Sequence, residues 1–98
     1  MNVGIVGLGL IGGSMAKSVK ARTAHTVYGA DLDQETMTLA RMSGAIDGPL
    51  TEESLPRCDL LLVAICTGAA VKWVRDHAGQ IAKSAIVVDL CGVERGVV

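Results

Sequence analysis

Short apolar segments alternate with amphipathic ones along the chain, and this pattern predicts its elements. Residues 3–6, 25–30, 60–65 and 85–89 are rich in apolar or β-branched side chains and have the length of strands. Between them, apolar positions recur every three or four residues, which is typical of amphipathic helices. The predicted order is therefore strand, helix, strand, helix, strand, helix, strand (βαβαβαβ).

The three predicted helices differ in how clearly their ends are marked. In the first, Ile11, Met15 and Val19 recur every four residues. The second starts after Asp33, a suitable N-cap, and runs to about residue 43, where Gly44 stands in the position of a left-handed C-cap glycine. The third has one apolar face, formed by Val71, Val74, Ala78 and Ile81.

Three of the predicted strands are nearly continuous apolar runs, so both faces of their sheet must be covered. Parallel sheets with helices on both faces have this property, and alternation of strands and helices produces them. We therefore expect an α/β fold with a parallel sheet, formed as a single domain by residues 1–98. Residues 45–58, which contain Gly48, Pro49 and Pro56, are expected to be a loop with one short turn.

Composition and charge exclude several classes of protein. Half of the 98 residues are hydrophobic and only 19% are charged, which excludes intrinsic disorder. The net charge is −1 and no basic stripe is present, so we expect no nucleic-acid partner. The longest apolar run, residues 60–66, is far shorter than the roughly 18 residues of a membrane-spanning helix, so we expect no membrane association.

The cysteine pattern indicates reduced thiols. Cys58, Cys66 and Cys91 are three in number and show no C-x-x-C spacing, which argues against a disulfide framework or a zinc site. A cytoplasmic location follows as an expectation. Cys66 and Cys91 lie near strand ends without a neighbouring His or Lys to lower their pKa, so we interpret them as passive wall residues.

The string G-L-G-L-I-G directly follows the first predicted strand and opens the first predicted helix. Gly7 permits the tight turn, Gly9 leaves room for a pyrophosphate, and Gly12 allows the helix to pack closely on the strand. The N–H groups of Leu10 and Ile11 would face the phosphates, and the helix dipole favours negative charge there. In this context the pattern G-x-G-x-x-G predicts a dinucleotide site.

Asp31 strengthens this prediction because it ends the second predicted strand, about 20 residues after Gly12. An acidic side chain at that place accepts hydrogen bonds from the adenosine ribose. Leu32 and Asp33 follow, with no arginine for a 2′-phosphate, so NAD is favoured over NADP. The plainer alternative is that Asp31 merely ends a strand and the glycines merely form a turn.

Together these signals predict a Rossmann-like sheet with the strand order 3-2-1-4. The fourth strand, residues 85–89, would normally be covered by a fifth, whereas the sequence stops at Val98. We therefore expect a sheet that is incomplete after the fourth strand. An open apolar edge of this kind pairs with other chains, so self-association is expected.

The strings around the glycine motif resemble the prephenate/arogenate dehydrogenase family over essentially the whole chain. They are V-G-I-V-G-L-G-L-I-G-G-S at 3–14, Y-G-A-D at 28–31, G-A-I-D at 44–47, D-L-L-L-V-A at 59–64 and V-D-L-C-G-V-E at 88–94. The resemblance implies NAD(P)-dependent oxidative decarboxylation of prephenate to 4-hydroxyphenylpyruvate, a step in tyrosine synthesis. It also implies a further helical domain for dimerisation and substrate, so that the chain would be a partial NAD-binding domain.

The resemblance also implies roles for individual residues. The cofactor would be held by Gly7, Gly9, Leu10, Ile11 and Gly12 at the pyrophosphate, by Asp31 at the ribose, and by Ala64, Ile65 and Cys66 beside the adenosine. Residues 89–94 would lie below the nicotinamide and near the substrate. Two positions depart from the family: it often has Pro where Cys66 stands and Ser where Gly92 stands.

No catalytic residue is assigned within these 98 residues. The family's catalytic histidine lies in a His-Pro string on the next strand, beyond Val98, and neither His25 nor His77 lies in such a string. Trp73 and His77 are spaced i, i+4 on the third predicted helix and are expected to pack together or to form an interface.

Two other functions stay open. The chain could be a stand-alone dinucleotide-binding module that regulates without catalysis, or the first domain of an arogenate or another hydroxyacid dehydrogenase. A His-Pro string and a helical domain after Val98 in the gene would support an enzyme, and a stop codon would support the module.

Overall fold

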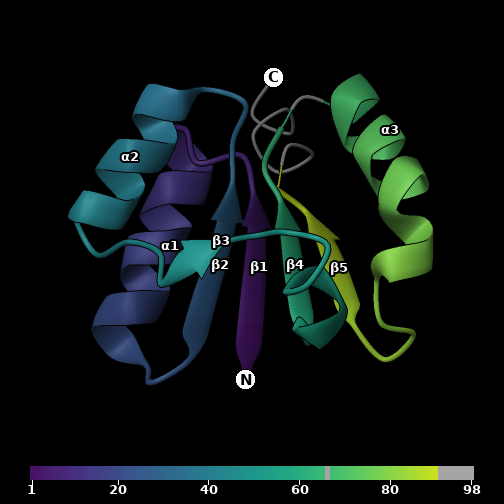
Figure 1. The fold of residues 1–98 in the computed structure, drawn as a ribbon, viewed down its shortest axis with the longest axis horizontal. Coiled ribbons are helices and arrows are strands. Elements are labelled where there is room, and N and C mark those ends of the chain that lie inside the picture. Colours follow the sequence, from purple (N-terminus) through teal and green to yellow (C-terminus); the bar gives the residue numbers. More distant parts are fainter. Residues whose placement is uncertain (66, 91–98) are drawn as a thin grey trace.

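The computed structural model describes residues 1–65 and 67–90 as a parallel sheet with helices on both faces (Figure 1). The strands are β1 (Asn2–Val6), β2 (Thr26–Ala30), β3 (Gly48–Pro49), β4 (Leu60–Val63) and β5 (Ile86–Asp89). The helices are α1 (Leu10–Arg22), α2 (Gln34–Met42) and α3 (Thr67–His77), with 3-10 turns η1 (Leu55–Arg57) and η2 (Ala78–Gln80). The expected α/β class and Rossmann-like parallel sheet are thus confirmed.

The strand order is 3-2-1-4-5 and includes one strand that the sequence does not predict. The sequence predicts a loop over residues 45–58, but Gly48 and Pro49 form β3, which pairs in parallel with Tyr28 and Gly29 of β2. The expected order 3-2-1-4 recurs as numerals, but other segments hold the places of strands 3 and 4. Strand β3 lies beside β2, where the segment at 60–65 is expected, and β4 lies beside β1, where the segment at 85–89 is expected. The segment at 60–63 is the fourth strand and pairs with β1, and the segment at 86–89 is the fifth.

Strand β3 escapes prediction because Gly and Pro disfavour strands locally. Tertiary hydrogen bonds hold it in place instead. The backbone N–H of Asp47 donates to the carbonyl oxygen of Val27 at 2.7 Å, and that of Leu50 donates to Gly29 at 2.7 Å. The Asp47 carboxylate also accepts from the Val27 N–H at 2.7 Å and forms an ion pair with Lys20 at 2.9 Å.

Each face of the sheet has its own apolar core. On one face, Val3, Ile5 and Val27 pack with Ala16 of α1, and partly buried residues of α2 close the cluster. On the other face, a second cluster lies beneath η1 and α3; its buried members are Val6, Leu55, Leu61, Val63 and Ala70. The two clusters explain why the central strands are apolar at nearly every position.

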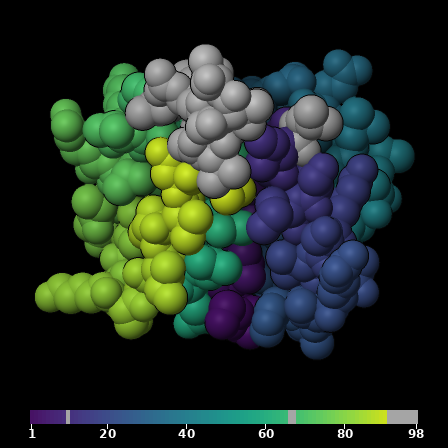
Figure 2. Space-filling view, turned by 180° about the vertical axis from the view of Figure 1, so that it is seen from behind, coloured from purple at the N-terminus to yellow at the C-terminus, as the bar shows by residue number. Residues whose placement is uncertain are grey.

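Strand β5 departs from this pattern, although the sequence predicts coverage on both faces. Ile86 is 64% exposed and Val87 is 42% exposed. Figure 2, which views the molecule from behind, shows the atoms of β5 in yellow at the surface between α1 and α3. The burial of an apolar strand depends on what packs on it, and nothing in its own composition decides that.

Two predicted helix ends are confirmed and one is wrong. The Asp33 side chain caps α2 by accepting from the Glu35 N–H at 3.3 Å, and Gly44 has a φ of +76°, the left-handed conformation of a C-cap glycine. The third predicted helix extends to Ile81, whereas α3 ends at His77 and continues as the tighter turn η2. Strand β4 ends at Val63, two residues before the predicted end.

Candidate nucleotide-binding site

The glycine turn after β1 begins with a residue that only glycine can provide. Gly7 has a φ of +91°, which L-residues with a side chain rarely adopt. Its N–H donates to the carbonyl oxygen of Ala30 at 2.7 Å, so the turn starts in register with the end of β2. A Cβ on Gly7 would lie 2.8 Å from both the Ala64 carbonyl oxygen and the Ile65 Cγ2. Strands β1 and β4 therefore end in close contact at this residue.

Gly12 and Gly9 meet different surroundings. A Cβ on Gly12 would overlap the carbonyl oxygen of Gly7 and lie 2.9 Å from its carbonyl carbon, so α1 can approach the turn only with glycine there. A Cβ on Gly9 would meet nothing within 4 Å. Glycine at position 9 is therefore not required by the protein's own packing, and the space above it is open to a ligand.

The start of α1 is suited to an anion. Gly9 is the N-cap, and the first internal hydrogen bond runs from the Gly13 N–H to the Gly9 carbonyl at 2.8 Å. The preceding N–H groups of the helix have no intrahelical acceptor. No acidic residue lies in the first turn of α1 to compete with a bound phosphate. The backbone of Leu10 and Ile11 lies in this first turn, where the sequence analysis expects the pyrophosphate.

Asp31 joins the end of β2 to the glycine turn. Its Oδ2 accepts a hydrogen bond from the Leu8 N–H at 2.8 Å, and its Oδ1 accepts one from the Asp33 N–H at 2.9 Å. Each carboxylate oxygen has a second lone pair, so both can still accept from ribose hydroxyls. Asp31 therefore has a second task, orienting the turn, which the sequence analysis did not include.

An apolar cavity of about 450 Å³ lies at the carboxyl ends of β1, β2 and β4, the place where open α/β sheets bind ligands. Its polar side chain is the Asp31 carboxylate. The other lining residues are Val6, Gly7, Ala30, Leu32, Ile65, Ala69 and Trp73. The cavity therefore offers an apolar slot with one carboxylate at its end, which suits a flat base attached to a ribose.

Three of the predicted site residues, Gly7, Asp31 and Ile65, come together in this cavity. Those of the glycine turn lie beside it at the start of α1. Cys66 and the stretch 91–94 lie outside the described residues, and Asp89 is the last residue of β5.

The sequence did not identify five of the residues that line the cavity, among them Leu32, Ala69 and Trp73. Leu32, Ala69 and Trp73 are apolar, and nothing in their spacing distinguishes a ligand wall from ordinary packing. The clearest sequence signal is that of Leu32, which directly follows Asp31; the structure adds that its side chain is fully exposed. The interpretation of Trp73 as a packing residue needs extension, because its ring also faces this cavity.

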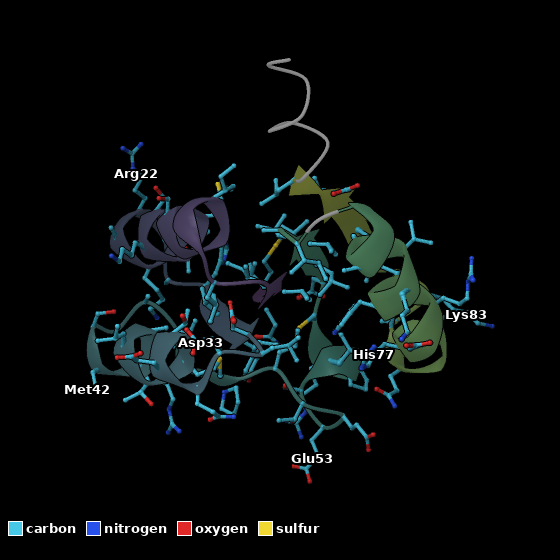
Figure 3. All side chains as sticks on the ribbon, turned by 90° about the horizontal axis from the view of Figure 1, so that it is seen from above. Arg22, Asp33, Met42, Glu53, His77 and Lys83 are labelled. Carbon is cyan, nitrogen blue, oxygen red and sulfur yellow. The ribbon has the colours of Figure 1, made fainter. Side chains whose placement is uncertain are left out.

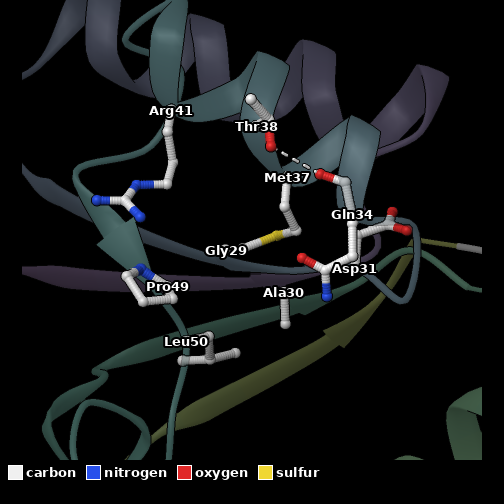
Figure 4. Close-up of a pocket in the computed structure, with 9 residues that line it drawn as sticks. All are labelled: Gly29, Ala30, Asp31, Gln34, Met37, Thr38, Arg41, Pro49 and Leu50. Atoms are coloured by element: carbon white, nitrogen blue, oxygen red, sulfur yellow. Dashed lines mark hydrogen bonds between the residues drawn. The ribbon is translucent and has the colours of Figure 1, made fainter.

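A second cavity, of about 380 Å³, lies between α2 and β3 and shares Ala30 and Asp31 with the first. Figure 4 shows Arg41 and Asp31 at opposite ends of it, with Met37 between them. Arg41 is the basic residue among those that line this cavity, and it does not reach the Asp31 carboxylate. The negative charge of Asp31 is therefore not neutralised from this side.

Three titratable groups that do not line the cavity have structural roles. Burial raises the pKa of the Cys58 thiol, and the neighbouring Asp59 charge raises it further, so this thiol is a poor nucleophile. The hydroxyl of Thr36 lowers the pKa of Asp33, the cap of α2. Lys20 of α1 forms an ion pair at the surface with Asp47 at 2.9 Å.

Other kinds of site find no support in the part of the chain that is described. Within residues 1–65 and 67–90, no group of three His, Cys, Asp or Glu side chains is placed to hold a metal ion. None of the helices in those same ranges combines the length and apolar character that crossing a membrane requires.

Three comparisons with known proteins place this chain. A family model for the nucleotide-binding domain of prephenate dehydrogenase matches residues 15–98. The match begins at residue 15, after the glycine turn, so the turn supports a nucleotide site independently of this family model. No curated protein sequence matches significantly.

Solved structures match over nearly the whole chain. Synechocystis arogenate dehydrogenase has a TM-score of 0.83 at 26% identity, over 91% of this chain and 32% of its own. Aquifex aeolicus prephenate dehydrogenase in complex with hydroxyphenyl propionate and NAD+ has a TM-score of 0.80 at 27% identity, over 91% and 32%. A further structure of prephenate dehydrogenase from A. aeolicus has a TM-score of 0.78 at 26% identity, over 89% and 33%. The chain thus spans about a third of the length of these enzymes, and it belongs to the prephenate dehydrogenase family, as a nucleotide-binding domain.

Proposed function

We propose that this chain is the cofactor-binding part of an NAD-dependent prephenate dehydrogenase that acts in tyrosine synthesis in the cytoplasm. One observation carries the proposal. The Asp31 carboxylate lies at the end of an apolar cavity and is hydrogen-bonded to the Leu8 N–H of the glycine turn. A ribose site, a phosphate site and a base site are thereby joined in the order in which a dinucleotide presents these groups.

The residues of this chain bind and orient the cofactor. The N–H groups at the start of α1 would hold the pyrophosphate, and the helix dipole stabilises its charge. The Asp31 carboxylate would accept from the ribose hydroxyls while it keeps the turn in place through Leu8. Ile65, with Cys66 beside it in sequence, would lie along the adenosine. Bound NAD supplies a hydride acceptor, which is the chemistry that oxidation of the substrate ring requires.

The charges around Asp31 favour NAD over NADP. A 2′-phosphate would lie beside two carboxylates, those of Asp31 and Asp33. The two residues are held together by a hydrogen bond from the Asp33 N–H to the Asp31 carboxylate. Arg41, the basic residue of the adjoining cavity, lies at the far end from Asp31 (Figure 4). The negative carboxylates would repel the negative 2′-phosphate, so NADPH should bind more weakly than NADH.

Calorimetric titration of the chain with NADH and NADPH tests this proposal. We expect NADH to bind more tightly, and Asp31→Asn to reduce the preference. An asparagine oxygen can still accept from the Leu8 N–H, so this variant removes charge while it keeps the turn. Glu53→Gln is the matched control, since it removes one negative charge from an exposed side chain that does not line the cavity. Equal affinities for the two cofactors, or no binding of either, would contradict the proposal.

Arogenate is the second candidate substrate, because the Synechocystis enzyme that this chain resembles at a TM-score of 0.83 is an arogenate dehydrogenase. Steady-state assays of the full-length protein with prephenate, arogenate and 3-hydroxy acids distinguish the candidates. Turnover of 3-hydroxy acids alone would indicate a different hydroxyacid dehydrogenase. A full-length protein that binds NADH and turns over none of the three would support the regulatory module.

A further inference from the structure

Among the described residues that line the cavity next to Asp31, Trp73 is the aromatic one, and its ring is stacked on another ring. The ring centroids of Trp73 and His77 are 4.1 Å apart, with 19° between the ring planes. His77 Nδ1 lies 2.7 Å from the Trp73 carbonyl oxygen. A carbonyl oxygen can only accept, so the Nδ1 proton of His77 is donated and the imidazole is held in place over the indole.

The two cavities that meet at Trp73 show which part of the indole is covered. A smaller cavity of about 320 Å³ is lined by both Trp73 and His77, together with Leu50, Thr51, Glu52 and Leu55 among others. The cavity beside Asp31 includes Trp73 but not His77. The stacked imidazole therefore does not line the larger cavity, and Trp73 stays accessible from the side of Asp31.

Figure 3, seen from above, shows His77 on the side of α3 that is turned toward the rest of the molecule, whereas Lys83 points away from it. The stacked pair thus lies between α3 and the connection that contains η1. Both rings are only half-buried. An indole that is fixed from one side and open on the other is a preformed stacking surface.

We propose that Trp73, held by His77, is the platform on which the adenine ring of the cofactor stacks. This inference rests on the proposed function and adds to it a residue that selects for an aromatic base. A base attached to a ribose at Asp31 would extend into the apolar slot between Leu32 and Ile65 and meet the indole at its end. Offset stacking and apolar burial would then favour adenine over the non-aromatic groups that the slot could also admit.

Titration of the unaltered chain gives the first test, because Trp73 is its single tryptophan. Adenosine monophosphate and NADH should both change the emission of Trp73 on binding, and nicotinamide mononucleotide should not. Calorimetry run in parallel measures binding independently of fluorescence. Binding of adenosine monophosphate with unchanged Trp73 emission would overturn the platform.

Variants at position 73 separate stacking from simple filling of space. We expect Trp73→Phe to keep most of the affinity for adenosine monophosphate, and Trp73→Leu to lose about tenfold. Equal affinities of the Phe and Leu variants would overturn the proposal, because an apolar wall needs no π-system. If circular dichroism shows that Trp73→Leu is unfolded, the emission titration of the unaltered chain still tests whether adenine stacks on Trp73.

Position 77 tests how the platform is held. His77→Phe keeps a ring on the indole and should preserve binding, whereas His77→Ala frees the indole and should weaken binding of adenosine monophosphate. His25→Ala is the matched control, since His25 contacts the chain's amino terminus and lies outside the cavity. Failure of NADH to bind the unaltered chain would refute the proposed function as well. Equal NADH affinities of Trp73→Phe and Trp73→Leu would refute the stacking platform and leave the proposed function standing.

Discussion

Replacing Gly9 with alanine separates the fold from the binding site. Gly9 has φ −71° and ψ −151°, which alanine adopts without strain, and a Cβ there meets nothing within 4 Å. Alanine is a poorer N-cap than glycine but reduces the entropy of the unfolded chain, and these two effects oppose each other. We therefore expect the free energy of unfolding to change by less than about 1 kcal/mol.

The same methyl group would stand where a pyrophosphate must approach the start of α1. Loss of one hydrogen bond to a charged group costs about 1.5–3 kcal/mol, which corresponds to at least about a tenfold loss of NADH affinity. Two other glycines give the opposite behaviour. Gly12→Ala forces a methyl group onto the Gly7 carbonyl and should destabilise the fold by about 3 kcal/mol. Gly44→Ala places alanine at φ +76° in open space and should cost about 1 kcal/mol without affecting NADH binding.

The assay combines urea unfolding, which gives stability, with calorimetric titration of NADH, which gives affinity. Gly9→Ala should lose affinity at nearly unchanged stability, and Gly44→Ala should lose stability at unchanged affinity. Wild-type affinity in Gly9→Ala would show that no phosphate approaches this residue. A Gly12→Ala chain as stable as the wild type would refute the close packing of α1 on the turn.

Three further outcomes are expected. Among the described residues β5 is an outer strand with exposed Ile86 and Val87, so the chain should self-associate, and Ile86→Lys should reduce this; strictly monomeric sedimentation at high concentration would contradict it. Lys20 lowers the pKa of Asp47 below its ordinary 3.8, so Asp47→Asn should cost less than about 1 kcal/mol at neutral pH, and the cost should vanish as the pH falls below that value; a cost that persists in acid would exclude the ion pair as its source. Because burial raises the pKa of the Cys58 thiol, a thiol reagent should modify it only when the chain unfolds, and rapid labelling of the folded chain at Cys58 would refute its burial.

The glycine turn shows how far local sequence can determine a site. The φ of +91° at Gly7 and the contact between Gly7 and Gly12 are steric consequences of a strand that turns directly into a helix. Such constraints act within a few residues, so a motif and its spacing predict them. Asp31 could be assigned to a ribose site in the same way, because it ends a strand at a known distance from the turn.

The contact of Asp31 with the Leu8 N–H could not be predicted from spacing, because residues 23 positions apart meet there only once β1 and β2 pair. The same holds for Trp73. Its helical spacing to His77 predicts the stacked pair, but the cavity beside it exists only because α3 packs over the ends of β1 and β4.

The sequence by itself determined the parallel α/β class, the glycine turn, the helix caps at Asp33 and Gly44, and the family, because periodicity, sterics and motif spacing act locally. Only the tertiary structure decided that Gly48 and Pro49 form a strand, that β4 lies beside β1, and that the side chains of Ile86 and Val87 on β5 are exposed. Hydrogen bonds and burial between distant segments set these features. A strand with weak local propensity forms when a neighbour offers its backbone, and an apolar strand is buried only where another element covers it.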